Sequence, residues 1–197
     1  IDVHSANQFN PADGFINSAF LYMEHMPYLD RLWFGEYFKY EKSPAYWLTD
    51  VSGIPFGMMS EMLQDGGNPY RGMLYGMTAR EPMESVPSQL WKVWDMFGIK
   101  DSRMMGYWVS YNPIKTGRND ILATTFVKEG KVMIAIASWA DKDSDVTLQI
   151  DWSKLGIDPS RAKLTAPAIK GFQEGFVLSP KDKIRVPKDK GYLFILE

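Results

Sequence analysis

At 197 residues, the chain is long enough for one large domain or two small ones. Hydrophobic residues make up 45% of it, which excludes a disordered polar segment. The formal net charge of −2 provides no broad attraction to nucleic acid or to an anionic membrane, and no apolar run is long enough to cross a bilayer. We therefore expect no nucleic-acid partner and no membrane span. Cysteine is absent, which excludes disulfides, thiolate metal sites and cysteine nucleophiles.

The start of the chain is typical of a strand already under way. It opens on Ile1-Asp2-Val3-His4, with no initiator Met and no signal-peptide pattern. We expect the chain to be a piece of a longer protein and to contact the remainder of that polypeptide.

The two halves of the chain differ in composition, which favours two domains. Residues 1–100 have a net charge of −5 and hold 18 of the 28 aromatic residues. Residues 101–197 have a net charge of +3. An acidic, aromatic-rich half beside a basic half indicates two domains with different tasks.

The first half alternates between expected strands and expected helices. The strands are expected at 1–4, 28–35 and 71–78, and the helices at 14–26, from 43 onward and at 88–97. Ser43 and Pro44 are a favoured N-cap and first helical residue. This alternation predicts parallel strands with helices outside them. Two or three such units cannot close a barrel of eight, so residues 1–100 are interpreted as the last part of a (β/α)8-type barrel.

The second half is typical of antiparallel β structure. Apolar stretches at 121–127 and 131–139 flank Lys128-Glu129-Gly130, which predicts a hairpin. Apolar and polar residues alternate from Val146 to Trp152, which predicts one half-buried strand. Short strands with turns between them predict a C-terminal β-sandwich over residues 101–197.

Three stretches of the chain resemble a known family. They are RLWFGEYF, SGIPFGMMSEMLQDGGNPYRGMLYGMT and VMIAIASWADKDSDVTLQIDWSKLGID. They are similar to the end of large Bacteroidetes-type glycoside-hydrolase-like proteins related to the family 123 hexosaminidases. The IDWSKLGI tail is also similar to the β-domain that closes α-galactosidase-type enzymes.

The resemblance implies a barrel catalytic domain, an upstream β-domain and a C-terminal β-sandwich. It also implies a carbohydrate substrate and a periplasmic or secreted location. The adjacent pair of acidic residues that family 123 enzymes use does not occur in this chain, so no catalytic residue is carried over. The chain alone is expected to be inactive.

Glu36 is the catalytic candidate that its position favours most. It follows the apolar run Leu32-Trp33-Phe34 and Gly35, and functional side chains of a (β/α) barrel lie at the C-terminal ends of its strands. A carboxylate there can act as an acid or a base, although glycosidic cleavage usually requires two carboxyl groups. Tyr37 follows and is a candidate substrate contact. The alternative is a Glu that caps a loop or forms an ion pair.

Five further polar residues are candidate substrate contacts, each with a structural alternative. Asp2 and His4 end the first expected strand, and the alternative is ordinary polar residues at a trimmed terminus. Asp65, Asn68 and Arg71 surround a Gly-Gly turn, where a barrel rim would meet substrate, and the alternative is a solvated turn.

Trp108 is the aromatic candidate. With Tyr107 it can stack on a sugar ring, and the alternative is packing between the two domains. An incomplete barrel should also leave an apolar flank, which we expect near Leu32, Trp33, Phe34 and Met73.

Metal and cofactor chemistry is not predicted. His4 and His25 are too few for a zinc site. The Asp141-x-Asp143-x-Asp145 sequence begins like a calcium loop but lacks the glycine and glutamate that such a loop requires. No nucleotide-binding motif is present. We therefore expect no metal and no cofactor.

Three classes of function remain open. The first is part of a glycoside hydrolase, the second a non-catalytic carbohydrate-binding or structural module, and the third an inactive barrel in a scaffold protein. A second carboxylate within catalytic distance of Glu36 would favour the first class. An exposed aromatic strip on the β-sandwich would favour the second.

Overall fold

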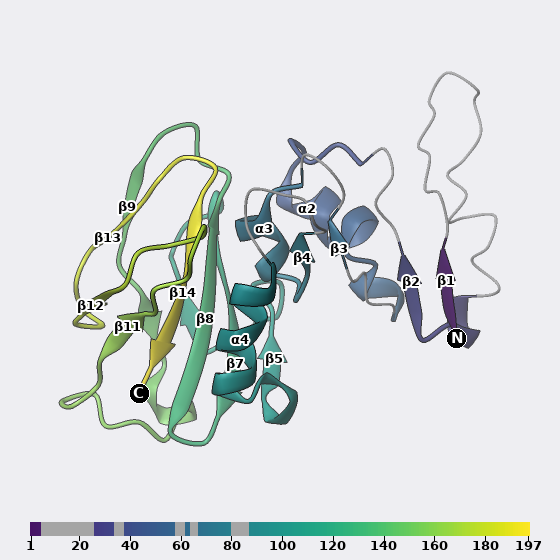
Figure 1. Cartoon of the computed structure of the whole chain (residues 1–197). Coiled ribbons are helices and arrows are strands. Elements are labelled where there is room, and N and C mark those ends of the chain that lie inside the picture. The colour runs from purple at the N-terminus through teal and green to yellow at the C-terminus, as the bar shows by residue number, and fades with distance from the viewer. Residues whose placement is uncertain (5–25, 34–37, 58–61, 64–66, 80–86) are drawn as a thin grey trace.

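A computed structural model of the chain describes residues 1–4, 26–33, 38–57, 62–63, 67–79 and 87–197. Within these residues the fold combines short helices, two small parallel sheets and a larger set of antiparallel strands (Figure 1). No helix in this part of the chain has the length and apolarity that spanning a bilayer requires.

A six-stranded antiparallel sheet is the centre of the fold. Its strands lie in the order β12-β11-β14-β8-β7-β5. Their bounds are β5 Arg103–Met105, β7 Ile121–Lys128, β8 Lys131–Ser138, β11 Leu164–Ala166, β12 Phe176–Leu178 and β14 Gly191–Leu196. Strands β7 and β8 form the predicted hairpin, with Lys128 opposite Lys131.

Two antiparallel strand pairs lie on one face of this sheet. They are β6 (Ile114–Lys115) with β10 (Gln149–Ile150), and β9 (Ser144–Val146) with β13 (Ile184–Val186). The prediction of one strand from Val146 to Trp152 was wrong, because Val146 pairs with β13, Ile150 pairs with β6, and Trp152 begins the 3-10 helix η6 (Trp152–Lys154). The predicted alternation of burial holds from Val146 to Gln149.

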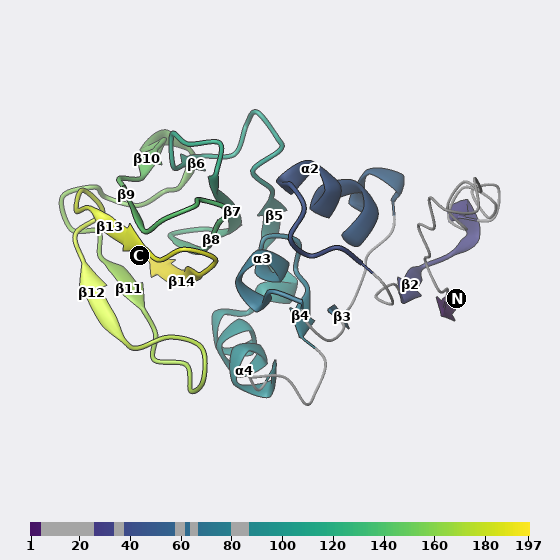
Figure 2. The same ribbon diagram turned by 90° about the horizontal axis from the view of Figure 1, so that it is seen from above.

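The opposite face of the sheet carries the helical part of the chain (Figures 1 and 2). The helical segments on this side are α2 Pro44–Tyr46, the π-helix η3 Trp47–Val51, η4 Ile54–Phe56, α3 Pro69–Met73, α4 Pro87–Phe97 and η5 Ile99–Asp101. A further 3-10 helix, η2, spans Met26–Tyr28. The predicted start at Ser43 is confirmed, because the Ser43 hydroxyl accepts a hydrogen bond from the Tyr46 amide. The predicted helix at 88–97 is confirmed as α4, whereas the helix expected at 14–26 lies almost wholly outside the described residues.

The parallel strands are short and form two separate pairs. These are β1 (Asp2–His4) with β2 (Arg31–Trp33), and β3 (Met62–Leu63) with β4 (Thr78–Ala79). The strand predicted at 71–78 was mostly wrong. Asn68 and Pro69 begin α3 there instead, because the Asn68 side chain accepts hydrogen bonds from two amides of the first turn.

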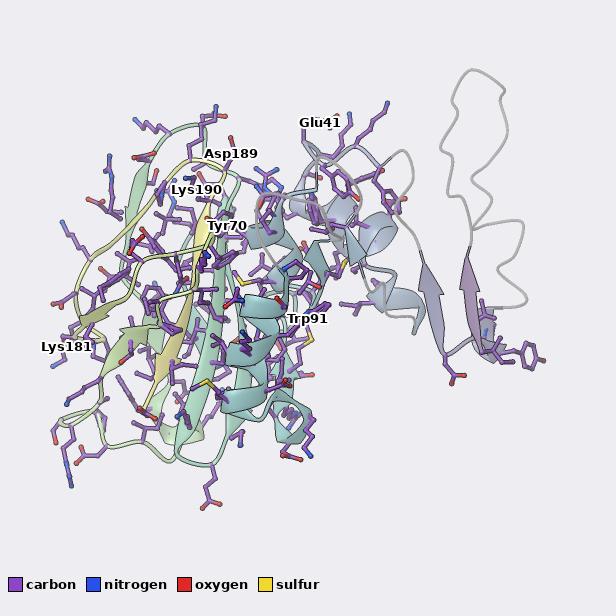
Figure 3. All side chains as sticks on the ribbon, in the orientation of Figure 1. Glu41, Tyr70, Trp91, Lys181, Asp189 and Lys190 are labelled. Atoms are coloured by element: carbon purple, nitrogen blue, oxygen red, sulfur yellow. The ribbon has the colours of Figure 1, made fainter. Side chains whose placement is uncertain are left out.

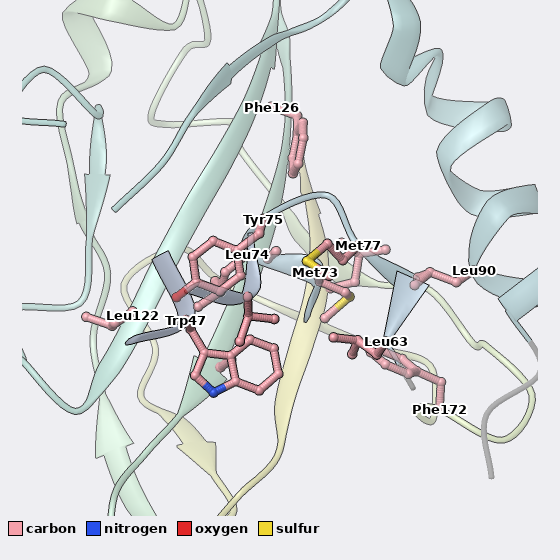
Figure 4. Packing of buried hydrophobic residues seen from close by; sticks show 14 of the residues in the cluster. Trp47, Leu63, Met73, Leu74, Tyr75, Met77, Leu90, Leu122, Phe126 and Phe172 are labelled. Atoms are coloured by element: carbon pink, nitrogen blue, oxygen red, sulfur yellow. The ribbon is translucent and has the colours of Figure 1, made fainter. Parts of the chain in front are cut away.

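The six-stranded sheet separates two hydrophobic cores. Along β8, Met133, Ala135 and Ala137 face the helices, and the residues between them face the two strand pairs. Figure 4 shows the helix-side core, in which side chains of α3 and η3 pack with Leu122 and Phe126 of β7. Every residue of β8 after Lys131 is buried, which is the pattern of a strand covered on both faces.

Met73 does not lie on an exposed apolar flank. Its side chain is fully buried in the helix-side core, so the expectation for this residue was wrong. The side chains of Leu32 and Trp33, and the whole of Phe34, lie outside the described residues.

Gly191 provides a test of how closely β14 and β8 approach each other. A Cβ atom on Gly191 would overlap the backbone carbonyl of Ile136, which cannot move without distorting the sheet. We expect Gly191→Ala to lower the free energy of unfolding by about 1–3 kcal/mol, the usual cost of overpacking, in urea denaturation. Gly175→Ala is the control, because its Cβ would lie 3.1 Å from Ala168 and should cost less. Equal effects of the two substitutions would contradict the model of this strand pair.

Candidate functional site

Several predicted site residues lie where the structure gives no side chain. Glu36, Tyr37 and Asp65 are outside the described residues. The backbones of Asp2 and His4 pair with Arg31 and Trp33 in the parallel pair β1–β2, but their side chains are not described. Their assignment as catalytic or substrate-binding residues stays a prediction.

Asn68 joins the start of α3 to the C-terminal half of the chain. Its Oδ1 accepts hydrogen bonds from the Tyr70 and Arg71 amides, both at 3.0 Å. Its Nδ2 donates to the carbonyl oxygen of Asp189 at 2.6 Å. Asp189 belongs to the turn between β13 and β14, and its φ of 55° is unusual for a residue other than glycine. One side chain thus caps a helix and contacts a turn 121 residues away.

Arg71 is the centre of the contact between α3, the end of β8 and the β13–β14 turn, which we call the junction. It is 6% exposed, and all three guanidinium nitrogens donate to protein acceptors. Nε donates to the Ser138 carbonyl at 3.1 Å, Nη1 to the Tyr40 carbonyl at 3.0 Å, and Nη2 to Asp189 Oδ1 at 2.7 Å. Figure 3 shows Asp189 on the side of the turn that faces α3.

The electrostatics of Arg71 are those of a buried, compensated cation. Burial lowers the pKa of the Arg71 guanidinium, and the adjacent Asp189 carboxylate opposes that shift. The guanidinium carbon also lies 4.7 Å from the ring centre of Trp139, a cation–π distance. Because its donors are engaged, Arg71 stabilises the contact between α3 and the sheet. Arg71 is therefore not part of a solvated turn. Its assignment as a substrate contact at a barrel rim stays a prediction.

Trp108 packs in the core between the two halves. Its ring stacks on Tyr75 at 5.7 Å between ring centres and 7° between planes, and Tyr75 stacks in turn on Trp47 at 6.0 Å. A Cβ on Gly106 would overlap the Trp108 indole, so a glycine at 106 is required for this stack. This packing agrees with the alternative that Trp108 packs between the two halves of the chain. Because Trp108 is only half-buried, its stacking on a sugar stays a prediction.

Two tyrosine hydroxyls meet beside this stack. The hydroxyls of Tyr75 and Tyr107 lie 3.0 Å apart, and both approach the Pro44 carbonyl, at 3.3 Å and 2.9 Å. Burial raises the pKa of both phenols, so they remain neutral hydrogen-bond donors. They attach the first turn of α2 to the segment that follows α3, through Tyr75, and to the segment that follows β5, through Tyr107.

Asp50 was not selected from the sequence and differs electrostatically from three other described carboxyl groups. Burial raises the pKa of Asp50, whereas hydrogen bonds lower the pKa values of Asp120, Asp151 and Asp158. The Thr49 hydroxyl donates to Asp50 Oδ2 at 2.7 Å, which opposes the shift. The residue lies in η3, on the helical side of the sheet. No sequence signal distinguished it, because its burial depends on tertiary packing.

The described residues thus form a rigid junction rather than a complete catalytic constellation. Within the described part of the chain, no group of three His, Asp or Glu side chains is arranged to hold a metal ion. The contribution of the junction is to fix α2 and α3 on the sheet.

Two arginine–aspartate pairs allow the energy of the junction to be measured. Arg71–Asp189 and Arg118–Asp120 both have a closest contact of 2.7 Å, but the Arg71 side chain is 7% exposed and the Arg118 side chain 38%. We expect Arg71→Met to lower the free energy of unfolding by about 2 kcal/mol or more, because it leaves the buried carbonyls of Ser138 and Tyr40 without their donor. Arg118→Met should cost less than about 1 kcal/mol, as exposed pairs do. Chemical denaturation of both variants tests this, and equal losses would be inconsistent with the junction.

Comparison with known protein families gives two matches in chain order. Residues 1–82 match the TIM-barrel domain of glycoside hydrolase 123, and residues 86–197 match the C-terminal domain of glycoside hydrolase 123. No curated protein matches the chain. The two matches meet between residues 82 and 86, ahead of the border predicted near residue 100, and the division into domains stays a prediction. Together they cover nearly the whole sequence, and the chain belongs to glycoside hydrolase family 123.

Proposed function

We propose that the chain is the C-terminal part of a glycoside hydrolase that acts on glycans or oligosaccharides outside the cytoplasm. In this proposal residues 1 to about 100 supply the last βα units and part of the rim of a (β/α)8 barrel. The remaining residues form an accessory β-sandwich. The carbohydrate substrate follows from membership of the family.

The proposal is supported by the order of the two family matches and by the direction of strand pairing within each matched range. Both described parallel pairs, β1–β2 and β3–β4, fall in the range that matches the barrel domain. The six-stranded antiparallel sheet falls in the range that matches the C-terminal domain. Parallel strands are the unit of the barrel, and antiparallel strands are the unit of a sandwich.

The need for further barrel strands follows from the geometry of parallel sheets. The two described parallel sheets have only two strands each, whereas a (β/α)8 barrel has eight parallel strands that are buried on both faces. Functional side chains of a barrel come from the ends of several strands. The proposed catalytic site therefore requires more parallel strands than the described residues contain.

The antiparallel strands from β5 to β14, here called the β-domain, have a positioning role in this proposal. Asn68 and Arg71 connect α3 to the β13–β14 turn and to β8. They follow Gly66-Gly67, at the turn where a barrel rim is expected to meet substrate. In this proposal the sheet thereby holds α3 in position next to that rim.

The first test is the activity of the chain by itself. We expect the purified 197-residue chain to give no enzymatic hydrolysis of an aryl glycoside, because the two catalytic carboxyl groups must be positioned by the ends of several strands of a closed barrel. The measurement is release of the nitrophenol group from a panel of nitrophenyl glycosides. Robust turnover by this chain would refute the proposal that it is part of a larger catalytic unit.

The second test concerns Glu36 in the polypeptide that carries the complete barrel. If Glu36 is a catalytic acid or base, Glu36→Gln should lower kcat by about 10²–10⁴-fold and leave the unfolding temperature unchanged. If it only orients sugar hydroxyls, the loss should be smaller and fall partly on KM. Glu41→Gln is the matched control, because Glu41 is an exposed glutamate five positions on. Wild-type activity of Glu36→Gln would exclude both roles.

A further inference from the structure

A pocket of about 500 Å³ lies where α2 meets the β-domain, apart from the predicted rim residues. We call it the junction pocket. It is lined by Pro44, Tyr107, Asn112, Ile114, Lys115, Thr116, Gly117, Arg118, Asn119, Leu122 and Ala123. Figure 2 shows the segment between β5 and β6 on the side of the β-domain that faces α2. The volume is within the range of roughly 300–1,000 Å³ for small-molecule sites.

The floor and one wall of the junction pocket are apolar and fixed in position. Ile114, Leu122 and Ala123 on the floor are buried core residues of the β-domain. The Tyr107 ring forms a wall, and its hydroxyl is held by the Pro44 carbonyl at 2.9 Å. A flat aromatic ring beside an apolar floor suits the apolar face of a pyranose ring.

Buried polar side chains make the loop of the junction pocket rigid. Asn112 Nδ2 donates to the Ala123 carbonyl at 2.9 Å, and Asn112 Oδ1 accepts from the Ile114 amide at 3.1 Å. The Thr116 hydroxyl donates to the Ile121 carbonyl. Asn112 and Thr116 are therefore occupied by the protein, and the loop is organised before any ligand arrives.

The rim of the junction pocket is rich in hydrogen-bond donors. Its exposed side chains are Lys115, Arg118 and Asn119, and the pocket lining contains no acidic residue. Asp120 holds Arg118 through Nε and Nη2, both at 2.7 Å, which fixes the direction of the guanidinium. Among the described residues no carboxylate lies within ion-pair distance of Lys115. A rim of this kind favours a ligand that carries a negative charge.

We propose that the junction pocket binds an acidic sugar, a pyranose that carries a carboxylate. Its ring packs on Tyr107 and the floor, and its carboxylate accepts hydrogen bonds from Lys115 and Asn119. The choice of a saccharide rests on the proposed function, whereas the preference for an anion rests on the rim alone. The pocket then acts as a secondary binding site that holds an acidic glycan near the barrel.

The test is an NMR titration of the 197-residue chain at low ionic strength with three probes. D-Glucuronate is the acidic sugar, D-glucose is the matched neutral sugar, and acetate is the free carboxylate. We expect glucuronate to bind at least about tenfold more tightly than either control, because only glucuronate supplies both ring and charge. The shifted amides should be those of Thr116, Gly117 and Asn119, and added salt should weaken binding.

Matched charge reversals separate this site from general attraction to a basic surface. Lys115→Glu should weaken glucuronate binding at least about tenfold, and Lys115→Gln should weaken it less. Lys181→Glu is the control, because Lys181 is an exposed lysine on the far side of the β-domain (Figure 3). It should change the affinity less than about twofold.

Several outcomes would overturn the proposal. They are equal binding of glucose and glucuronate, acetate binding as tightly as glucuronate, absence of saturable binding, or a Lys115→Glu variant with wild-type affinity. Binding is measured without turnover. A negative result therefore leaves the assignment as part of a hydrolase intact, and failure of that assignment does not change what the titration reports.

Discussion

The burial of one charged side chain, Arg71, is the constraint on which the junction depends. A guanidinium that leaves water loses hydration that only well-placed acceptors can replace. Here the acceptors come from three distant segments, through the carbonyls of Tyr40 and Ser138 and the carboxylate of Asp189. If any one segment moves away, a buried donor loses its partner. The helical segments and the sheet are therefore expected to keep one relative position.

The six-stranded sheet makes this arrangement possible because both of its faces are covered. Strand β8 contributes side chains to two cores, one with the helices and one with the strand pairs β6–β10 and β9–β13. The chain that follows β8 also supplies Trp139, which lies under the Arg71 guanidinium and donates from its indole to the Lys42 carbonyl at 2.9 Å. Packing and polar contacts thus converge on the same strand.

Local signals predicted the local structure, and tertiary contacts decided the rest. Gly130 between two apolar runs predicted the β7–β8 hairpin, and Ser43-Pro44 predicted the start of α2. The run Met73-Leu74-Tyr75 suggested a strand because short buried segments have the same composition in either structure, although Asn68-Pro69 carried a helix start signal. The role of Arg71 could not be predicted, because its partner Asp189 is 118 residues away in the sequence. The junction pocket could not be predicted either, because α2 and the β6–β7 loop meet only in the folded chain.

We expect the helical segments that contact the six-stranded sheet to unfold together with it as one unit. Native-state hydrogen exchange tests this most directly, by comparing the amide of Gly72 in α3 with that of Ile134 in β8. The Gly72 amide donates to the Asn68 carbonyl at 3.0 Å, within the helix that Arg71 anchors. We expect both amides to exchange only through global unfolding, with the same free energy of opening. Exchange of Gly72 at a free energy several kcal/mol below that of Ile134 would contradict this expectation, because α3 would then open while the sheet stays folded.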